Sequence, residues 1–281
     1  MMAADMKMTI DLLMEKIGLP EEGQRTVRGF QLPEGQYKEW KKCFYEDVDH
    51  FLTMAEKEPD KEKLVLVLYL RFAVDLYEKF KEKGISDQIY YDTFLDFTIW
   101  YLECVKKHGS CGLEEKRWLS LSLKMEIYRL GRLQFQPGVL EEDEVCGELR
   151  WEKGSRVLHV HIPEGGAIDE ASCDESFCQA IQFFGEEYEI FDCYSWILDP
   201  EILSLLSEKS NLYKFQKRFQ ICKVTYEFPQ AEERVFGEVL EDKERYPENT
   251  SLQRILKKCV LQGQKFGLGY GIMPKEEIKK N

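Results

Sequence analysis

The sequence of 281 residues carries little positive charge: 39 lysines and arginines stand against 52 acidic residues, a net charge of −13. A protein that binds nucleic acid over a broad surface needs a basic face for the phosphates, so we expect no nucleic-acid partner. A local basic pocket for a small phosphorylated ligand is still compatible with this composition. Hydrophobic residues make up 43% of the chain and aromatic residues 13%, which excludes a disordered chain.

The sequence also lacks a long uninterrupted hydrophobic run. Its most apolar stretch, residues 64–77, contains Arg71 and Asp75 and is shorter than the ~20 apolar residues that cross a bilayer. Acidic residues interrupt the N-terminal segment, where a signal peptide needs a continuous apolar run. We therefore expect no membrane span and no export signal, and we expect a cytoplasmic protein.

Clustered cysteines and the common catalytic signatures are missing as well. The nine cysteines are odd in number and scattered, a pattern typical of reduced thiols. They are Cys43, Cys104, Cys111, Cys146, Cys173, Cys178, Cys193, Cys222 and Cys259. No Walker loop, His-Glu-x-x-His helix or Gly-x-Ser-x-Gly elbow occurs, so none of these standard motifs identifies a function.

Helical spacing of apolar residues is what the first part of the chain does contain. It recurs in five stretches, residues 6–17, 37–55, 61–81, 87–107 and 114–130. Short segments with glycine or proline end several of these stretches, as helix-terminating signals do. Because the connections are short, the pattern predicts a helical bundle.

Alternation of apolar and polar residues replaces helical spacing after Leu130. We predict a turn at Pro137-Gly138, and a hairpin through Gly154 that joins the second and third of the strands named next. The predicted strands are 130–136, 145–151, 156–162, 188–198, 221–228 and 266–273. The predicted helices are 174–184, 201–219 with a break near Ser210, and 250–261, followed by a solvated tail at 275–280. An all-helical half thus precedes an α/β half.

A glycine loop that feeds a helix is the most informative local unit. Residues 163–172 follow the strand 156–162, and Ser172 and Glu175 have the spacing of a capping box, which predicts a helix start at Ser172. Free backbone N–H groups at such a start can bind a phosphate. The loop is also rich in acidic residues, which repel an anion. A phosphate cradle and a tight structural turn both fit this pattern.

Two of the four histidines, His159 and His161, share one face of the strand 156–162. They are candidates for a general base and its neighbour. With Cys173 and Cys178 they are also candidates for a zinc site, although close Cys-x-x-Cys spacing is missing. A pair of hydrogen-bonded strand histidines is the third interpretation. The C-terminal FGLGYG has the wrong spacing for a dinucleotide fingerprint, and we interpret its glycines as structural.

Six motifs, taken in order, resemble a known family. They are RLGRLQFQ (129–136), HVHIPEGG (159–166), CDESF (173–177), SWILDP (195–200), SNLYKFQKRF (210–219) and NTSLQR (249–254). Together they are similar to bacterial proteins that have an N-acyltransferase N-terminal domain followed by a GNAT-like C-terminal domain. The resemblance implies an α+β fold, with a helical bundle at 1–116 and a GNAT-like domain with an open mixed sheet at 117–281.

The resemblance also implies that acyl-CoA is the co-substrate and lies in a wedge between strands 156–162 and 188–198. The residues implied in cofactor binding are Ile162, Glu164, Gly165, Gly166, Ala167, Ser172, Cys193, Ser195, Trp196 and Asn211. The family carries Arg or Gln before the loop glycines, whereas this sequence has Glu164. Basic residues elsewhere are then needed for the pyrophosphate, and the candidates are Lys214, Lys217, Arg218, Arg254, Lys257 and Lys258.

Acyl transfer to an amine needs a base for the amine, donors for the thioester oxyanion and an acid for the leaving thiolate. His161 or His159 is the candidate base, backbone N–H groups at the end of strand 156–162 are the candidate oxyanion donors, and Tyr213 is the candidate acid. The expected partner is a small-molecule or peptide amine, with no metal and no membrane. The alternative function is a non-catalytic module of GNAT shape that binds acyl-CoA or a protein.

Overall fold

The computed structural model describes residues 7–280, which divide into two compact units. The first unit runs up to Leu130 and includes Pro163–Gly165, and the second comprises Gly131–Ile162 and the chain from Gly166 onward. The division after Leu130 lies later than the predicted boundary at residues 116/117.

The first unit is a helical bundle, as predicted. Its elements are α1 (Ile10–Lys16), α2 (Glu21–Gly29), α3 (Glu34–Glu46), α4 (Val48–Ala55), α5 (Lys61–Glu82), α6 (Asp87–His108), α7 (Lys116–Leu123) and the short β1 (Tyr128–Leu130). The single helix predicted at 37–55 is wrong. Asp47 has an extended backbone there, ends α3, and accepts from the N–H of His50 to cap α4.

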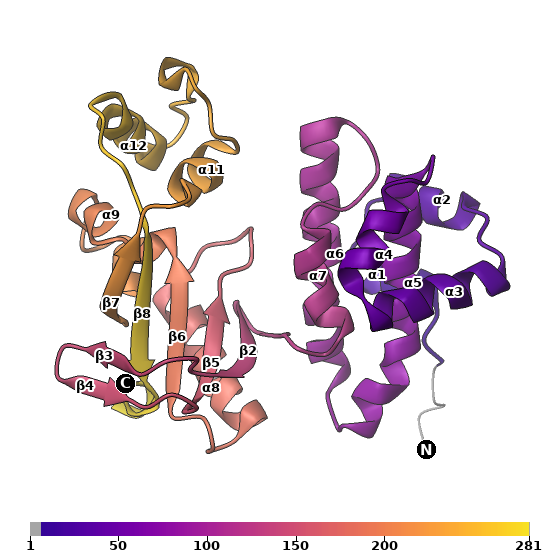
Figure 1. Cartoon of the computed structure of the whole chain (residues 1–281), viewed down its shortest axis with the longest axis horizontal. Coiled ribbons are helices and arrows are strands. Elements are labelled where there is room, and N and C mark those ends of the chain that lie inside the picture. The colour runs from indigo at the N-terminus through magenta and orange to yellow at the C-terminus, as the bar shows by residue number, and fades with distance from the viewer. Residues whose placement is uncertain (1–6, 281) are drawn as a thin grey trace. The chain divides into compact units, whose positions relative to one another are not determined.

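Aromatic rings fill the core of this unit along α5 and α6, the two longest helices (Figure 1). Phe80, Tyr90 and Phe94 pack edge to face or tilted, with ring centroids 4.9–5.9 Å apart. Such contacts add to the burial of the rings. The aromatic stripes of the sequence therefore serve the core of the bundle.

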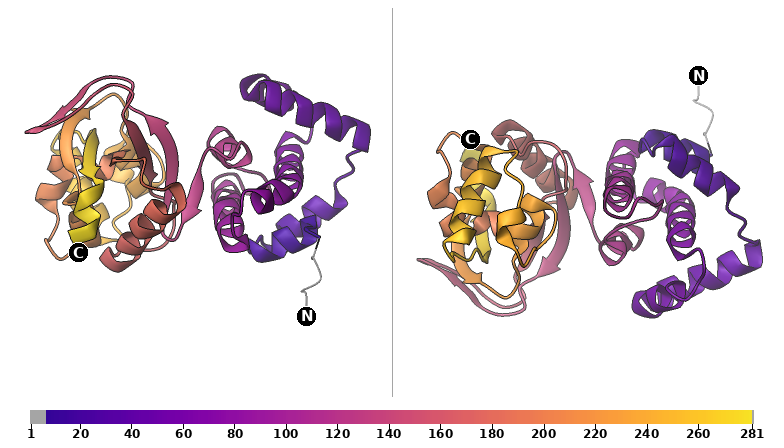
Figure 2. Two further views of the ribbon diagram at one scale, coloured as in Figure 1. Left: turned by 90° about the horizontal axis from the view of Figure 1, so that it is seen from below. Right: turned by 90° about the horizontal axis from the view of Figure 1, so that it is seen from above.

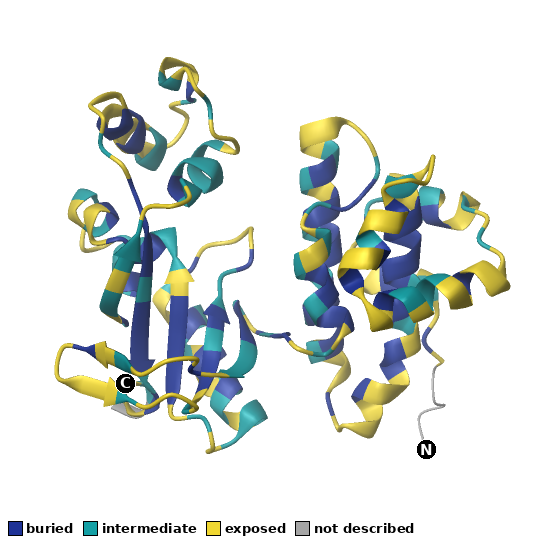
Figure 3. Cartoon of the chain, in the orientation of Figure 1, coloured by how far each residue is buried: buried dark blue, intermediate teal, exposed yellow. Residues whose placement is uncertain are grey.

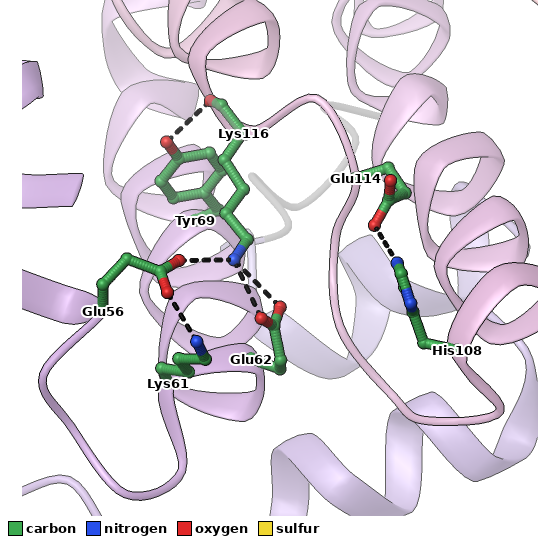
Figure 4. A network of polar contacts seen from close by, with 7 residues as sticks. All are labelled: Glu56, Lys61, Glu62, Tyr69, His108, Glu114 and Lys116. Carbon is green, nitrogen blue, oxygen red and sulfur yellow. Dashed lines mark hydrogen bonds and ion pairs between the residues drawn. The ribbon is translucent and has the colours of Figure 1, made fainter. Parts of the chain in front are cut away.

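Helix α7 belongs to the first unit because its first residue is bonded on several sides (Figure 4). Lys116 Nζ lies 3.3 Å from a Glu56 oxygen and 2.9 Å from a Glu62 oxygen, and its carbonyl accepts from the Tyr69 hydroxyl at 2.8 Å. The helix ends at Leu123, and Met125 has a left-handed backbone with φ of 59°. The predicted helix 114–130 is thus wrong beyond Leu123, where the chain turns into β1.

The second unit contains an open mixed sheet, as predicted. Its elements are β2 (Leu133–Val139), β3 (Glu144–Cys146), β4 (Leu149–Trp151), β5 (Arg156–His161), α8 (Glu170–Phe184), β6 (Ile190–Ser195), η1 (Trp196–Leu198), α9 (Pro200–Leu205), α10 (Asn211–Gln216), β7 (Gln220–Thr225), α11 (Gln230–Phe236), η2 (Lys243–Arg245), α12 (Ser251–Leu261), β8 (Leu268–Pro274) and η3 (Lys275–Lys280). Within this unit the strand order is β2-β5-β6-β8-β7, and β5–β6 is a parallel pair among antiparallel ones. Figure 3 shows β6 and β8 as its most buried strands.

The two faces of the sheet carry different partners. On the helix face, Phe135 of β2 and Phe191 of β6 pack on Phe177 of α8. The opposite face carries the segment of residues 140–155, which we call the strap. The strap leaves β2, contains the hairpin β3–β4, and returns to β5. Both views in Figure 2 show the strap on one side of the sheet and α8 on the other. We call this second face the strap face.

Two local predictions in the strap region are wrong. Strand β2 continues through Pro137 and Gly138, where we predicted a turn, because both residues pair with β5. The stretch 145–151 is a hairpin by itself that turns at Gly147, with a left-handed φ of 62°, so it does not pair with 156–162 through Gly154. The partners of β5 are β2 and β6 instead.

The sequence predicted that all nine cysteines are free thiols, and this prediction is wrong for two of them. Cys146 of β3 and Cys222 of β7 form a disulfide with Cα atoms 4.8 Å apart. Cys222 lies at the irregularity between Ile221 and Lys223 in the pairing of β7 with β8. The other seven cysteines carry free thiols.

The glycines of β8 are structural, as predicted. A Cβ at Gly269 would overlap the carbonyl of Leu198, and a Cβ at Gly271 would meet Phe219. Their missing side chains let η1 and the end of α10 approach the helix face of the sheet closely. The strand 188–198 consequently ends at Ser195, and residues 196–198 form η1 rather than strand.

The tail at 275–280 is not wholly solvated, because Lys275 is buried and its Nζ lies 2.7 Å from a Glu186 oxygen. Within residues 7–280, no helix combines the length and the apolarity that a membrane crossing requires.

Candidate active site

The parallel ladder between β5 and β6 ends inside the sheet. It pairs Val157 with Ile190, Leu158 with Phe191, and His159 with Asp192. Beyond that last pair, β5 continues to His161 while β6 stays paired with β8 as far as Ser195. The pairing of the two strands thus ends after His159 and Asp192, between the two strands where the family resemblance implied a wedge.

A buried carboxylate accompanies the last paired histidine. His159 Nδ1 lies 2.7 Å from Asp192 Oδ1, and the Tyr270 hydroxyl donates to Asp192 Oδ2 at 3.1 Å. Asp192 is only 4% exposed. Because a carboxylate accepts, His159 Nδ1 carries the proton and Nε2 of the neutral ring is the basic atom.

The environment of His159 sets its protonation. Burial lowers its pKa, but the hydrogen bond and the charge of Asp192, with a contribution from Glu141, outweigh burial and raise the pKa above the ordinary 6.5. Within the described residues, Nε2 makes no hydrogen bond. The side chain is one-third exposed.

Gly138 makes room for that ring. A Cβ at this position would overlap His159 Nε2, because Gly138 lies on β2 beside the histidine. The Pro137-Gly138 sequence, which we interpreted as a turn, therefore provides space on the strap face rather than a reversal of the chain.

His161 is less suited to be a base. Its Nε2 lies 3.2 Å from Gln136 Oε1, to which it donates. Burial, and the proximity of His159, lower its pKa to about 4. A group this acidic takes up a proton weakly near neutral pH. The geometry thus separates the two predicted candidates and favours His159.

The residues of the glycine loop, 164–167, are exposed, and Arg132 binds two of the loop's backbone carbonyls. Gly165 and Gly166 have left-handed φ angles of 79° and 75°. Arg132 Nε donates to the Ala167 carbonyl at 3.0 Å, and its Nη2 donates to the Gly166 carbonyl at 3.1 Å. In the described part of the chain, the N–H groups of Gly165, Gly166 and Ala167 donate no hydrogen bond. These three exposed N–H groups are the donors that the loop offers to an anion.

The N-cap of helix α8 lies three residues before the predicted cap. Asp169 is the N-cap, and its carboxylate accepts from the Ser172 N–H at 3.0 Å and from the Ser172 hydroxyl at 2.7 Å. The predicted start at Ser172 and its capping box with Glu175 are wrong, because Ser172 is the third residue of the helix. The N–H and hydroxyl of Ser172 both donate to Asp169, so Ser172 offers no free donor at the start of α8.

Basic side chains from α10 and its C-terminal end reach the first turns of α8. Lys214 Nζ lies 2.9 Å from Glu170, and Arg218 Nη1 lies 2.5 Å from Asp174. The basic residues of α12 are elsewhere: Lys257 pairs with Glu248, and the helix packs against α11 and η2. Of the two basic groups that the sequence offered, only the one on α10 contacts the first turns of the helix after the glycine loop.

Tyr213 and Asn211 lie on α10, whose N-terminus is capped by Ser210 through the Tyr213 N–H. The segment from α10 to Phe219 packs on the helix face, against α8 and Gly271, whereas His159 points to the strap face. The structure thus does not bring Tyr213 into contact with His159.

The predicted channel residues divide by location. Cys193 is buried on the helix face of β6, and burial raises the pKa of its thiol. The Ser195 hydroxyl accepts from the Ile197 N–H and caps η1. Trp196 packs against the core cluster around Ile202. Ile162 follows the free end of β5, and Glu164 belongs to the exposed loop after it.

Three residues of the candidate site were not predicted from the sequence: Asp192, Tyr270 and Arg132. Asp192 had a signal, because it is the only charged residue in the apolar core of β6, next to a strand with histidines on one face. Tyr270 and Arg132 had none, because their partners lie 78 and 34–35 residues away. Within residues 7–280, no three His, Cys, Asp or Glu side chains gather in a way that would hold a metal ion.

Family models match the chain over nearly its whole length. The GNAT-like C-terminal domain matches residues 127–273, more than half of the chain, and the N-acyltransferase N-terminal domain matches residues 8–125. This chain belongs to the GNAT-like C-terminal domain family. No curated protein matches its sequence.

Solved structures of acyltransferases share the fold of this GNAT-like protein at low identity. An acyltransferase mutant in complex with octanoyl-CoA has 19% identity and a TM-score of 0.76, over 94% of this chain and 87% of its own. An acyltransferase in complex with decanoyl-CoA and teicoplanin has 20% identity and a TM-score of 0.75, over 97% and 91%. A third, with CoA and 10C-teicoplanin, has 20% identity and a TM-score of 0.74, over 94% and 87%.

Proposed function

We propose that this protein is an acyl-CoA-dependent N-acyltransferase whose reaction takes place where β5 and β6 part. The observation that carries the proposal is the end of the parallel ladder at His159–Asp192, next to a glycine loop with three free N–H groups. Structures of similar fold hold octanoyl-CoA, decanoyl-CoA or CoA, which supports acyl-CoA as the co-substrate here.

The loop at residues 164–167 would hold the pyrophosphate through its backbone. Free N–H groups bind phosphate oxygens without a basic side chain, so Glu164 in place of Arg or Gln is tolerated. Arg132 fixes the two carbonyls that point away from these donors. Because Asp169 and Glu170 flank the loop, we expect weaker CoA binding than an arginine-bearing loop would give.

The pantetheine arm would then run along the free strand ends, past Ile162, Cys193 and Ser195. These positions follow the last paired residues of β5 and β6, so the backbone there is not committed to the ladder. N–H groups of the free end of β5 would donate to the thioester oxyanion.

His159 acts as the general base on the strap face. Its Nε2 takes a proton from the ammonium group of the acceptor, and the free amine attacks the thioester carbonyl carbon. The new C–N bond forms, the C–S bond breaks, and the CoA thiolate takes a proton from Tyr213, which approaches from the helix face. The second proton that the attacking nitrogen loses on becoming an amide passes through water to Tyr213 and restores its hydroxyl. Asp192 stabilises the imidazolium and holds the ring in the required tautomer.

The pKa of His159 fixes the pH dependence. A general base must be neutral, so kcat/KM rises with pH through the pKa of His159, which lies above its ordinary value. His161, with a pKa of about 4, is already neutral there and adds no limb to the profile near neutrality.

The acceptor we propose is a small molecule with a primary amine. Two of the structures of similar fold contain teicoplanin or its 10C derivative together with decanoyl-CoA or CoA. A base with an accessible Nε2 on the strap face suits an amine that arrives from that side.

The test is release of free CoA thiol from octanoyl-CoA in the presence of a panel of amines, with mass spectrometry of the acylated product. Turnover that depends on an amine is expected, and His159→Ala should abolish most of it. Stoichiometric acyl-CoA binding without turnover on any amine would instead assign a non-catalytic binding module.

A further inference from the structure

The strap crosses one face of the sheet and is fastened at both ends. At its base, the Leu140 N–H donates to the Ser155 carbonyl at 2.9 Å, next to the β2–β5 ladder. At its far end, the disulfide of Cys146 with Cys222 ties β3 to β7, at the opposite edge of the sheet. Figure 1 shows the strap leaving β2 and ending beside β7 and β8.

Lys223 connects the strap to the sheet beside that disulfide. Its Nζ lies 3.0 Å from Glu142 and 3.1 Å from Glu144, both in the strap. The same Nζ lies 5.0 Å from the centroid of the Tyr270 ring. The cation is thus held between two carboxylates of the strap and the face of an aromatic ring.

Tyr270 carries this connection to the active site. Its hydroxyl donates a hydrogen bond to Asp192 Oδ2, and His159 Nδ1 donates one to Asp192 Oδ1. Each carboxylate oxygen has one partner, so Asp192 cannot turn about its side chain without breaking one bond. A chain of contacts therefore runs from the disulfide through Lys223, Tyr270 and Asp192 to His159.

We infer that Tyr270 is a positioning residue, which orients Asp192 toward His159 and is itself held in place by the strap and its Cys146–Cys222 disulfide. The inference rests on the proposed function for its meaning in catalysis. Its direct consequence concerns the titration of His159, which is measurable without any turnover.

The charged and titratable groups around His159 come from several elements. Asp192 of β6 and Glu141 of the strap raise its pKa, and His161 lies on its own strand. Tyr270 of β8 acts on it through Asp192, and burial raises the pKa of this phenol, so it stays a neutral donor. Lys223, paired with Glu142 and Glu144, is the nearest cation on that side.

The sign of the change separates positioning from simple charge sharing. If the Tyr270 hydroxyl only shared the negative charge of Asp192, its removal would strengthen the carboxylate and raise the pKa of His159. If the hydroxyl orients Asp192, its removal lets the carboxylate turn away, and burial then lowers the pKa of His159.

The first experiment is NMR titration of His159 in Tyr270→Phe, which keeps the ring and removes one oxygen. We expect the pKa of His159 to fall, and the acidic limb of kcat/KM to shift to lower pH with it. Tyr194→Phe is the matched control, because Tyr194 lies opposite Tyr270 in the β6–β8 ladder and bonds to Thr225 instead. An unchanged or raised pKa in Tyr270→Phe, or an equal fall in Tyr194→Phe, overturns the inference.

The second experiment compares oxidised and reduced protein of the same sequence. A dithiol supplies two electrons and two protons, the Cys146–Cys222 bond becomes two thiols, and the dithiol becomes a cyclic disulfide. We expect reduction to lower the pKa of His159 in the wild type and to cause no further change in Tyr270→Phe. Cys222→Ala should reproduce reduction, and Cys178→Ser, at an exposed free thiol of α8, should not.

These outcomes stay distinct from the proposed function. If the pKa of His159 falls in Tyr270→Phe and on reduction, but the wild-type protein shows no turnover, the positioning role of Tyr270 is supported and the proposed enzymatic function is refuted. An unchanged pKa after reduction in an active enzyme refutes the role of the strap and leaves the enzyme in place. A melting curve of the reduced protein shows whether the sheet is still folded during the titration.

Discussion

Two sets of buried polar groups, one in each unit, make hydrogen bonds of different kinds. In the helical unit, the buried hydroxyls of Tyr69 and Tyr90 donate to the backbone carbonyls of Lys116 and Ala73. In the sheet, the buried Asp192 bonds to two other side chains, and a histidine nitrogen beside it makes no hydrogen bond in the described structure. Hydroxyls bonded to the backbone support the fold, whereas linked side chains that leave a basic atom free are the ones for which we propose a chemical role.

The largest expected effect is the loss of the base. His159→Ala should lower kcat by about 10²–10⁴-fold, because the ammonium acceptor then has no positioned proton acceptor. The melting temperature should change little, since the ring is partly exposed and packs against a glycine. His108→Ala is the control, at an exposed histidine of the helical unit. A kcat within twofold of the wild type would remove His159 from the mechanism.

A truncation in the helical core should affect stability alone. Phe94 is fully buried among Phe80, Tyr90 and Phe97, so Phe94→Ala should lower the free energy of unfolding by about 3–5 kcal/mol. Denaturant unfolding measures this change, with the half-exposed Leu102→Ala as the control. The titration of His159 should not move in either variant. A shift of its pKa would show that the two units do not divide fold and chemistry as described.

Filling the space under His159 should disturb geometry without removing a functional group. Gly138→Ala places a Cβ where His159 Nε2 lies, so the ring must turn away. A displacement of the base by roughly 1 Å can cost about 10²-fold in rate, which is the upper bound we expect for kcat. Gly35→Ala in α3, where a Cβ meets nothing, is the control. Unchanged kcat and an unchanged pKa of His159 would show that the ring is not held there.

The smallest expected effect is the loss of a helix cap in the sheet unit. Thr250 and Gln253 form a capping box at the start of α12, away from the wedge. Thr250→Ala should lower the free energy of unfolding by about 1 kcal/mol, and Thr250→Ser should restore most of it. Neither change should alter kcat. A loss of activity here would mean that bonds to the backbone in this unit also support the chemistry.

How much of the structure the sequence predicts depends on the range of the interactions. The helical bundle, the α/β half after it and the break near Ser210 follow from local spacing and capping, whereas the open sheet was implied by the family resemblance, and the structure has them all. The start of α8 was misplaced because Asp169, three residues before Ser172, caps the helix by accepting from the Ser172 N–H. The β2–β5 pairing through Pro137 and the Cys146–Cys222 bond depend on contacts across the sheet, which local patterns do not contain.

The candidate site was predictable in part for the same reason. His159 was found because two histidines on one strand face are rare in a chain with four. The choice of His159 over His161 needs Asp192, which lies one strand away and 33 residues later. Tyr270 is further still, and only the strand order places it beside that carboxylate.

The most direct test of an acyl-transfer site at the end of the β5–β6 ladder is an NMR titration. The ring signal of His159 is followed while octanoyl-CoA is added to the protein, with no acceptor amine present. His159→Ala assigns the signal, and His108 serves as the internal control. We predict saturable binding of one acyl-CoA per chain, with a shift of the His159 signal and none of the His108 signal. Saturation without any change at His159, or no binding at millimolar octanoyl-CoA, would contradict an acyl-transfer site at the end of the β5–β6 ladder.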